Sequence, residues 1–193
     1  MKIDIILAGV GGQGILSIAA TIGLAAVDAG MYLKQAEVHG MSQRGGDVQS
    51  HLRLSDKEIA SDLIPEGKAD MIISVEPMES LRYLPMLSPD GWVITNTKPF
   101  VNIPNYPDLE QVMNEIAKTE KHITIDADKM ASDIGSPKSA NMIILGAASP
   151  FLNIEFVKLE NAIRFLFKNK GEEVVNKNIE ALHLGRNYTE KTL

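Results

Sequence analysis

Short apolar runs alternate with longer amphipathic runs along most of the chain. Residues 3–8 form an apolar run, and residues 14–29 form a longer segment rich in small and apolar side chains that Gly30 ends. Residues 47–54 alternate between apolar and polar positions, which is typical of a half-buried strand near a sheet edge or in a hairpin. Residues 70–75 are apolar over the length of a buried strand. The pattern therefore predicts strand, helix and further strands in that order.

The rest of the chain continues the alternation. Further strands are predicted at residues 31–36, 58–63, 92–96 and 122–125. Further helices are predicted at residues 78–86, 109–118, 128–134, 140–148, 154–169 and 172–184. Glycine and proline predict loops or turns at residues 37–46, 89–91 and 98–108, and the tail from 186 to 193 is expected to fray.

Strands that alternate with helices predict parallel β-α-β units with right-handed crossovers. We expect an α/β, Rossmann-like, doubly wound and mostly parallel sheet with flanking helices. One domain is expected over residues 1–193, and its part from about residue 126 to 193 should be mainly helical.

A glycine-rich turn joins the first predicted strand to the first predicted helix. Gly9, Gly11, Gly12, Gln13 and Gly14 belong to a match to G-x-G-x-x-G. Such a turn directs backbone N–H groups and a helix N-terminus at one spot, which is a common way to hold a phosphate. We predict that the turn binds an anion; the alternative is a tight turn whose glycines only permit close packing.

The same motif opens dinucleotide-binding domains, so an NAD(P)- or flavin-binding enzyme is an alternative. A dinucleotide site also needs an acidic residue at the end of the second strand, about twenty residues after the turn. Glu37 has that spacing, but Lys34 and Gln35 interrupt the strand before it and a polar loop follows. These features argue against an NAD(P)- or flavin-binding site but do not exclude it.

A second concentration of polar residues lies in the loop after the second predicted strand. It contains His39, Ser42 and Arg44, followed by Gly45 and Gly46. Arg44 beside two glycines can pair with a phosphate or carboxylate through two hydrogen bonds. The same polar residues are equally well explained if the loop is a solvent-exposed connection that binds no ligand. Because loops at strand carboxyl ends share one crevice in a doubly wound sheet, we expect this loop to face the glycine turn.

Composition excludes several classes of function. The chain has no cysteine, which excludes disulfides, thiolate catalysis and cysteine-ligated iron–sulfur clusters. A formal net charge of −6 argues against nucleic-acid and anionic-membrane partners. Residues 5–27 are uncharged, but the glycines and Gln13 within them argue against a membrane span or signal peptide. We expect a cytoplasmic protein with no metal site.

Three further polar residues follow strands or open a helix. Glu76 and Asn96 could line the crevice, although capping a helix is an equally good role for each. Asn141 opens an apolar helix and is most simply a cap. The chain lacks a G-x-S-x-G motif and a P-loop lysine, which argues against serine hydrolysis and P-loop chemistry.

Three segments together resemble a known family: the glycine turn, the sequence Glu-Val-His-Gly-Met-Ser-Gln-Arg-Gly-Gly at residues 37–46, and Asn-Met-Ile-Ile-Leu-Gly-Ala at residues 141–147. They are similar to the gamma-type subunit of the 2-oxoacid:ferredoxin oxidoreductases. The segment before Arg44 favours the indolepyruvate branch, and the pyruvate, 2-oxoglutarate and branched-chain branches are alternatives. The resemblance covers nearly the whole chain and is weaker near residues 110–121 and in the tail.

The resemblance implies a subunit of a complex for CoA-dependent oxidative decarboxylation of arylpyruvates to aryl-acetyl-CoA, with ferredoxin as the electron acceptor. It implies a large alpha subunit that carries thiamine diphosphate, magnesium and iron–sulfur clusters, and a chain that is inactive alone. The lack of cysteine agrees with this division. A structural or regulatory subunit that binds no ligand is a further alternative.

Coenzyme A is then the expected ligand of this chain, and its pyrophosphate suits the glycine turn and Arg44. No catalytic residue is assigned. The predicted binding residues are Gly9, Gly11, Gly12, Gln13, Gly14, His39, Ser42, Arg44, Gly45, Gly46 and Asn141.

Overall fold

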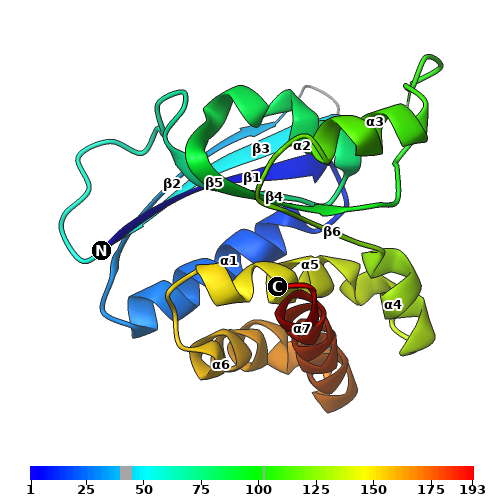
Figure 1. The fold of residues 1–193 in the computed structure, drawn as a ribbon. Coiled ribbons are helices and arrows are strands. Elements are labelled where there is room, and N and C mark those ends of the chain that lie inside the picture. The colour runs from blue at the N-terminus through cyan, green and yellow to red at the C-terminus, as the bar shows by residue number, and fades with distance from the viewer. Residues whose placement is uncertain (40–44, 102) are drawn as a thin grey trace.

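A computed structural model describes residues 1–39, 45–101 and 103–193, and its centre is one mixed β-sheet (Figure 1). The sheet has six strands in the order β2-β3-β1-β4-β5-β6. The pairs β1–β4, β4–β5 and β5–β6 are parallel, while β3 runs antiparallel to both of its neighbours. The strands are β1 (Lys2–Val10), β2 (Tyr32–His39), β3 (Asp47–Ser55), β4 (Ala69–Ser74), β5 (Leu87–Asn96) and β6 (His122–Ile125).

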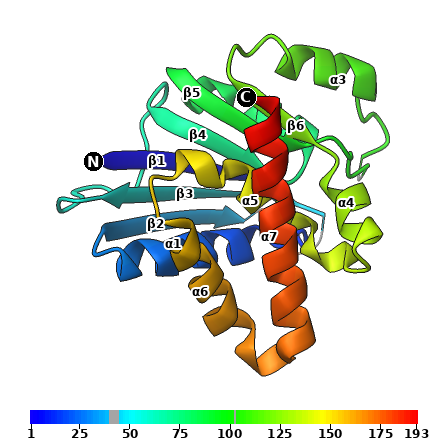
Figure 2. The same ribbon diagram turned by 60° about the horizontal axis from the view of Figure 1, so that its bottom comes forward.

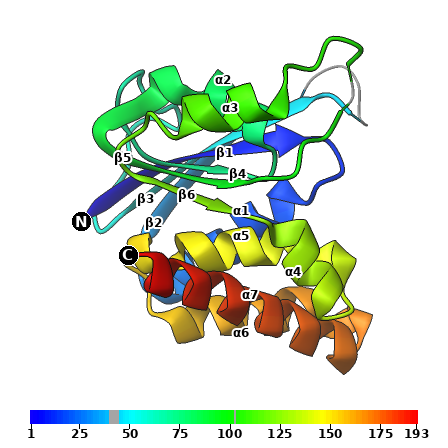
Figure 3. The ribbon, with the colours of Figure 1, turned by 45° about the vertical axis from the view of Figure 1, so that its right-hand side comes forward.

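Helices cover both faces of the sheet (Figures 1 and 3). One face carries α2 (Pro77–Arg82) and α3 (Leu109–Ile116). The other face carries α1 (Ile15–Asp28), α4 (Ala127–Asp133), α5 (Ala140–Ala148), α6 (Phe156–Phe167) and α7 (Glu172–Thr192). Short 3-10 turns are η1 (Leu84–Met86), η2 (Pro137–Ser139), η3 (Ser149–Phe151) and η4 (Lys168–Lys170). The predicted α/β class with a mostly parallel sheet and flanking helices is confirmed.

The central strands are buried because helices cover them on both sides. In β1, Ile5 and Leu7 pack in the core beneath α1 and α5, whereas Ile6 packs in a second core with Val112 of α3. None of the three β1 side chains is exposed to solvent. Strands buried on both faces are apolar at consecutive positions, which explains the uninterrupted apolar runs of β1 and β4.

Two predictions near the antiparallel strands are wrong. The loop predicted to begin at Glu37 begins later, because β2 continues through His39, which is paired with Val48 of β3. The strand predicted at residues 58–63 is absent. That segment is a loop in which the carbonyl groups of Ser61 and Leu63 accept hydrogen bonds from Arg53 Nη1 at 3.0 and 2.8 Å.

Two helix and turn predictions also need correction. The predicted helix at residues 78–86 ends as α2 at Arg82 and continues as the 3-10 turn η1, which contains Pro85. The turn predicted at residues 89–91 lies inside β5, where the pairing register with β4 shifts between Ala69 and Met71. Proline and glycine there mark an irregularity within the strand and do not end it.

The C-terminal tail is helical and packed, where fraying was predicted. Helix α7 continues to Thr192 and lies across α5 (Figure 2). Thr189 Oγ1 donates to the Ala147 carbonyl at 2.9 Å, and Tyr188 OH donates to the Thr124 carbonyl at 2.9 Å. These bonds join the end of the chain to α5 and β6.

Two glycines allow α5 and α7 to approach very closely. A Cβ atom built on Gly146 would lie 2.0 Å from the Leu182 carbonyl oxygen, and one on Gly185 would lie 1.9 Å from the Ile143 carbonyl oxygen. Any larger side chain at either position would collide with the backbone of the opposite helix. The two glycines therefore set the position of α7 on α5.

Candidate functional site

The carboxyl ends of the parallel strands meet where the helical connections change face. The connection after β1 is α1, on one face of the sheet, and the connection after the adjacent β4 is α2, on the other. Open α/β sheets bind ligands in the crevice at such a point.

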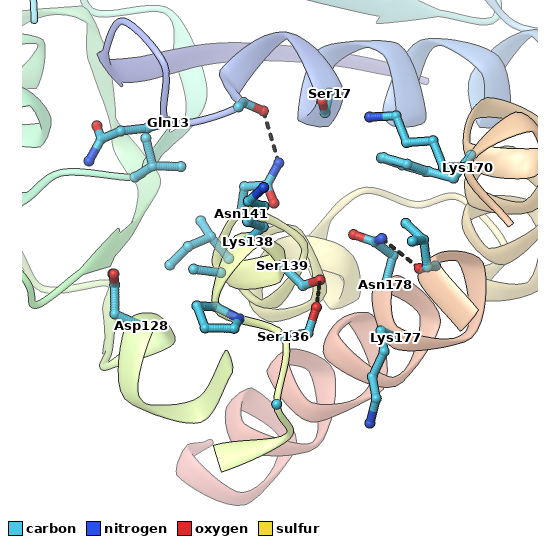
Figure 4. A pocket seen from close by; sticks show the side chains of 18 of the residues that line it. Gln13, Ser17, Asp128, Ser136, Lys138, Ser139, Asn141, Lys170, Lys177 and Asn178 are labelled. Carbon is cyan, nitrogen blue, oxygen red and sulfur yellow. Dashed lines mark hydrogen bonds between the residues drawn. The ribbon is translucent and has the colours of Figure 1, made fainter. Parts of the chain in front are cut away.

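A cavity of about 860 Å³ opens at these carboxyl ends, on the side of α5 and α7 (Figure 4). Its walls come from the glycine turn, from the ends of β4 and β5, and from α1, α4, η2, α5, α6, η4 and α7. It is lined by Gly12, Gln13, Gly14, Ser17, Val75, Asn96, Asp128, Gly135, Ser136, Pro137, Lys138, Ser139, Ala140, Asn141, Ile144, Phe167, Lys170, Glu173, Val174, Lys177 and Asn178.

The glycines of the turn have different roles. A Cβ on Gly9 would lie 2.4 Å from Val75 Cγ2, so this glycine permits close packing. Gly12 and Gly14 have φ of 100° and 82°, in the left-handed region that favours glycine. A Cβ on Gly12 would meet no atom within 4 Å, so its backbone faces open space. Gly9 therefore fits the packing interpretation of the motif, whereas the open space at Gly12 leaves room for a ligand.

Gln13 fixes the shape of the turn. Its side-chain Oε1 accepts a hydrogen bond from the Val10 backbone N–H at 2.8 Å, and its own backbone N–H donates to the Val10 carbonyl at 3.1 Å. The turn is therefore held in one conformation before any ligand arrives, which reduces the entropy that binding would cost.

The N-terminus of α1 opens into the cavity. The Gly14 carbonyl accepts from the backbone N–H groups of Ser17 and Ile18 at 3.0 and 3.3 Å, and the first turn of α1 contains no acidic residue. The N–H groups at the start of a helix have no partner within the helix, and the helix dipole adds a partial positive charge there. This arrangement suits an anion.

Asn141 joins α5 to the glycine turn. Its Nδ2 donates to the Gly14 carbonyl at 3.1 Å, and its Oδ1 accepts from the Met142 N–H at 3.0 Å (Figure 4). A Cβ on Gly14 would lie 2.5 Å from Asn141 Nδ2, so this contact also needs glycine at position 14. Asn141 therefore positions the turn and lines the cavity. The expectation that it caps the helix is wrong, because the N-cap of α5 is Ser139 and Asn141 lies within the first turn.

Asn96 and Glu76 occupy different places. Asn96 lines the cavity, and its side chain donates to Asp128 Oδ2 at 2.7 Å and accepts from the Ala127 N–H at 3.2 Å. Glu76 caps α2 by accepting the Glu79 N–H at 2.8 Å, and it also accepts a hydrogen bond from Tyr106 OH. Burial and that bond raise the pKa of Tyr106. Glu76 therefore anchors a loop.

Three lysines that line the cavity were not predicted from the sequence. Lys138 belongs to η2, Lys170 to η4 and Lys177 to α7, so only the tertiary packing of α7 brings them together. Lys177 Nζ pairs with Glu180 at 2.9 Å. No local motif marks these positions, and their separation along the chain hides their common location.

The segment around Gly45 and Gly46 contacts the turn from the β3 side. The Gly11 N–H donates to the Gly46 carbonyl at 2.9 Å, which confirms that the turn and this segment are neighbours. Of the predicted residues in the described part of the chain, the cavity lining includes Gly12, Gln13, Gly14 and Asn141 and omits Gly9, Gly11, Gly45 and Gly46. Ser42 and Arg44 lie outside the described residues, and of His39 only the backbone is described.

A cluster of titratable groups lies beside Gly46, between α2 and the start of β3. Tyr83 OH donates to Asp47 Oδ2 at 2.8 Å, and Arg82 Nε donates to Glu79 Oε2 at 2.7 Å. Burial raises the pKa of Glu79, against the influence of Arg82. Burial and the bond to Asp47 raise the pKa of Tyr83. These contacts connect α2 to β3 and do not reach the cavity lining.

The strand order disfavours a dinucleotide site. In dinucleotide-binding folds the second strand lies next to the first. Here Glu37 of β2 is paired with Ser50 of β3, which is paired with Leu7 of β1, so β3 separates Glu37 from β1. Two strand spacings, about 10 Å, keep its backbone from the position that a ribose-binding carboxylate needs.

The described residues contain neither a group of side chains that could bind a metal nor a helix suited to span a membrane. Among residues 1–39, 45–101 and 103–193, no three histidine, cysteine or carboxylate side chains are grouped so as to hold a metal ion. In the same residues, no helix combines the length and apolar character that a membrane span requires.

The chain is similar to several known proteins. The family model described as pyruvate ferredoxin/flavodoxin oxidoreductase matches residues 4–188. The chain is 37% identical to indolepyruvate oxidoreductase subunit IorB of Archaeoglobus fulgidus, over 97% of this chain and 95% of that protein. It is 36% identical to the protein of the same name from Pyrococcus horikoshii, over 94% of this chain and 93% of that protein.

A solved structure shows the same fold. The 2-oxoglutarate:ferredoxin oxidoreductase from Magnetococcus marinus, with 2-oxoglutarate, coenzyme A and succinyl-CoA bound, superposes with a TM-score of 0.80 at 24% identity. The match covers 98% of this chain and 31% of that longer chain. In that protein, therefore, the fold is one part of a larger polypeptide.

Proposed function

The chain belongs to the pyruvate ferredoxin/flavodoxin oxidoreductase family, and from this we propose that it is the smaller subunit of an arylpyruvate:ferredoxin oxidoreductase. The observation that carries the proposal is the 36–37% sequence identity of the chain, over nearly its full length, with proteins named as indolepyruvate oxidoreductase subunits. Indolepyruvate is accordingly the first substrate to test.

The proposed reaction is the oxidative decarboxylation of a 2-oxoacid. The bond between the carboxylate and the keto carbon breaks, carbon dioxide leaves, and the acyl group forms a thioester with the sulfur of coenzyme A. Two electrons pass to ferredoxin, and one proton is released. When bound on a large partner subunit, thiamine diphosphate with magnesium would supply the carbanion chemistry and iron–sulfur clusters the path for the electrons. This chain has no cysteine to ligate such clusters.

The part that we assign to this chain is binding coenzyme A in the cavity. Support comes from the open space at Gly12, the α1 N-terminus without acidic residues in its first turn, and the fixed turn conformation. A cavity of about 860 Å³ is also within the size range of cofactor sites. The backbone N–H groups of Gly12 and Gly14 and of the first turn of α1 would hold the pyrophosphate, since those of Gly11 and Gln13 donate to the Gly46 and Val10 carbonyls. The coenzyme A in the Magnetococcus marinus structure belongs to that protein, so here the site is argued from this chain's own residues.

Purification of the complex and a substrate comparison test the function. The chain would be co-expressed with its large subunit, and reduction of ferredoxin would be followed with indolepyruvate, pyruvate or 2-oxoglutarate, each with and without coenzyme A. The proposal predicts fast reduction with indolepyruvate that requires coenzyme A. Faster turnover of pyruvate or 2-oxoglutarate would place the chain in another branch, and NADH turnover by the chain alone would contradict the proposal.

A further inference from the structure

A hydrogen bond beside the glycine turn joins α2 to β3. Tyr83, which follows α2 directly, donates its hydroxyl hydrogen to Asp47 Oδ2 at 2.8 Å, and Asp47 is the first residue of β3. Neither residue lines the cavity. We propose that Tyr83 and Asp47 are positioning residues, whose hydrogen bond holds the glycine turn in the conformation that binds coenzyme A. The inference rests on the proposed function and extends it to residues beyond the cavity.

Asp47 is connected to the turn through the pairing of β1 with β3. It lies opposite Val10, the last residue of β1 before the turn. The connection continues one residue further, because the Gly11 N–H donates to the Gly46 carbonyl at 2.9 Å. Val10 also donates its N–H to Gln13 Oε1 at 2.8 Å, within the turn itself. A shift of Asp47 would therefore move the residues with which the turn begins.

The turn depends on its two ends for its position. Gly11 is bonded to Gly46 at one end, and the Gly14 carbonyl accepts from Asn141 at the other. A Cβ atom on Gly12, between these ends, would meet no atom within 4 Å. Backbone N–H groups bind a phosphate only when they converge on it, and binding groups must lie within about 0.5 Å of their productive positions. A small shift at either end should therefore weaken binding.

Tyr83 is the group that keeps the Asp47 side chain in place. Within residues 1–39, 45–101 and 103–193, Asp47 Oδ1 is the one buried side-chain nitrogen or oxygen that has no hydrogen-bond partner. The Tyr83 hydroxyl is the one donor to this carboxylate in the same ranges. A buried carboxylate needs donors to offset the loss of its hydration. Removing the Tyr83 hydroxyl would thus leave the Asp47 carboxylate without a donor from these residues.

The buried Glu79 carboxyl group increases this dependence on Tyr83. Burial raises the pKa of Glu79, the hydrogen bond from Arg82 lowers it, and the nearby Asp47 carboxylate raises it again. The two carboxyl groups therefore lie close enough for like charges to repel. Without the Tyr83 hydroxyl, Asp47 would keep this repulsion and lose its donor. We expect its side chain to turn toward solvent and to shift the start of β3.

Two tyrosine variants of the complex with the large subunit test the proposal. Tyr83→Phe removes the hydroxyl and keeps the ring. Tyr106→Phe is the matched control, because the Tyr106 hydroxyl also donates to a carboxylate, that of Glu76, and burial raises the pKa of both tyrosines. The Tyr106 bond anchors the loop after β5 and has no connection to β3. The Kd of coenzyme A would be measured by calorimetry, and turnover by reduction of ferredoxin.

We expect Tyr83→Phe to raise the Kd and the KM of coenzyme A about fivefold, while Tyr106→Phe leaves both at wild-type values. The kcat at saturating coenzyme A and the KM of indolepyruvate should not change in either variant, since only the placement of the turn is affected. Equal Kd values for the two variants would overturn the inference and leave the proposed function intact. A wild-type complex that does not bind coenzyme A would refute the proposed function as well.

Variants of Asp47 separate its hydrogen bond from its charge. Asp47→Asn keeps an oxygen that accepts from Tyr83, and its amide N–H groups can donate to Glu79. We expect Asp47→Asn to bind coenzyme A within about twofold of the wild type, and Asp47→Ala to bind about fivefold more weakly. Adding Tyr83→Phe to Asp47→Ala should cause no further loss, because both remove the same bond. Asparagine and alanine variants that bind equally weakly would contradict the positioning role.

Hydrogen exchange tests the position of the turn without any ligand. Exchange would be followed by mass spectrometry on peptides spanning residues 9–14, in complexes free of coenzyme A. We expect the Gly11 N–H to exchange about threefold faster in Tyr83→Phe than in the wild type, because its bond to Gly46 opens more often. Tyr106→Phe should exchange at the wild-type rate. Equal rates in the two variants would overturn the inference whatever the ligand of the cavity is.

Discussion

Replacing Gly185 by alanine should destabilise the protein, although alanine is ordinarily the better helix residue. The added Cβ would lie 1.9 Å from the Ile143 carbonyl oxygen and 2.8 Å from the Ala147 nitrogen. Both atoms belong to the backbone of α5, so they cannot move aside by rotating a side chain. Helices α5 and α7 would have to separate by more than about 1 Å to restore ordinary van der Waals contact.

Two opposing contributions set the expected size of the effect. Alanine in place of glycine stabilises an unobstructed helix by about 1 kcal/mol. Overpacking a close contact costs up to about 3 kcal/mol, and the backbone neighbours place this contact in the upper part of that range. The net loss in unfolding free energy is about 2 kcal/mol. In a chain of this length it should lower the Tm by about 4–8 °C.

Thermal unfolding followed by circular dichroism measures this loss for Gly185→Ala and, by the same argument, for Gly146→Ala. Gly23→Ala in α1 is the matched control, because its Cβ would meet only the Leu33 side chain, at 3.1 Å. The control should remain within about 1 kcal/mol of the wild type. A Gly185→Ala variant as stable as the wild type would refute the close approach of α5 and α7.

Two further predictions concern buried ionisable groups. Although burial raises the pKa of Asp4, Arg53 and Lys2 hold it below its ordinary value of 3.8. Asp4→Asn should therefore cost about 3 kcal/mol at neutral pH in denaturant titrations, because the largely buried Arg53 loses its partner. The stability that the Asp4 carboxylate contributes is lost as the pH falls through its lowered pKa. A difference in unfolding free energy between the wild type and Asp4→Asn that stays constant down to pH values near that pKa would therefore contradict the ion pair's role. Burial lowers the pKa of His51, whose Nδ1 accepts the Ile64 N–H at 3.0 Å. The neutral His51 ring stabilises the fold at pH values above 6.5, the ordinary pKa of histidine, and this stability is lost as the pH falls through the lowered pKa. The unfolding free energy of His51→Gln should therefore depend less on pH than that of the wild type in the same titrations.

The parts of the fold that local sequence determines were predictable. The β1 strand, the glycine turn and the start of α1 follow each other directly, and each has its own signal in apolar runs and glycine spacing. The prediction that the turn binds an anion rests on the same local order.

Long-range pairing was not predictable in the same way. Whether β3 pairs with β1 depends on non-local hydrogen bonds, and its insertion beside β1 is what moves Glu37 away from the turn. The lysines line one cavity only because α7 folds back over α5. Gly146 and Gly185 permit this packing, but their positions in the sequence do not predict it. Such contacts join distant segments and leave no periodic pattern in the chain.

Binding of coenzyme A by the glycine turn can be tested with a pair of glycine variants. Gly12 and Gly30 have φ of 100° and 74°, and a Cβ on either would meet nothing within 4 Å. Alanine should therefore cost each variant a similar folding free energy, about 1–2 kcal/mol, without a collision. Only Gly12 lines the cavity.

Coenzyme A would be titrated calorimetrically into complexes containing Gly12→Ala or Gly30→Ala. We expect Gly30→Ala to bind with the wild-type Kd, while Gly12→Ala binds at least about tenfold more weakly because its methyl group occupies the space where a phosphate approaches the backbone. Equal Kd values for the two variants would contradict it.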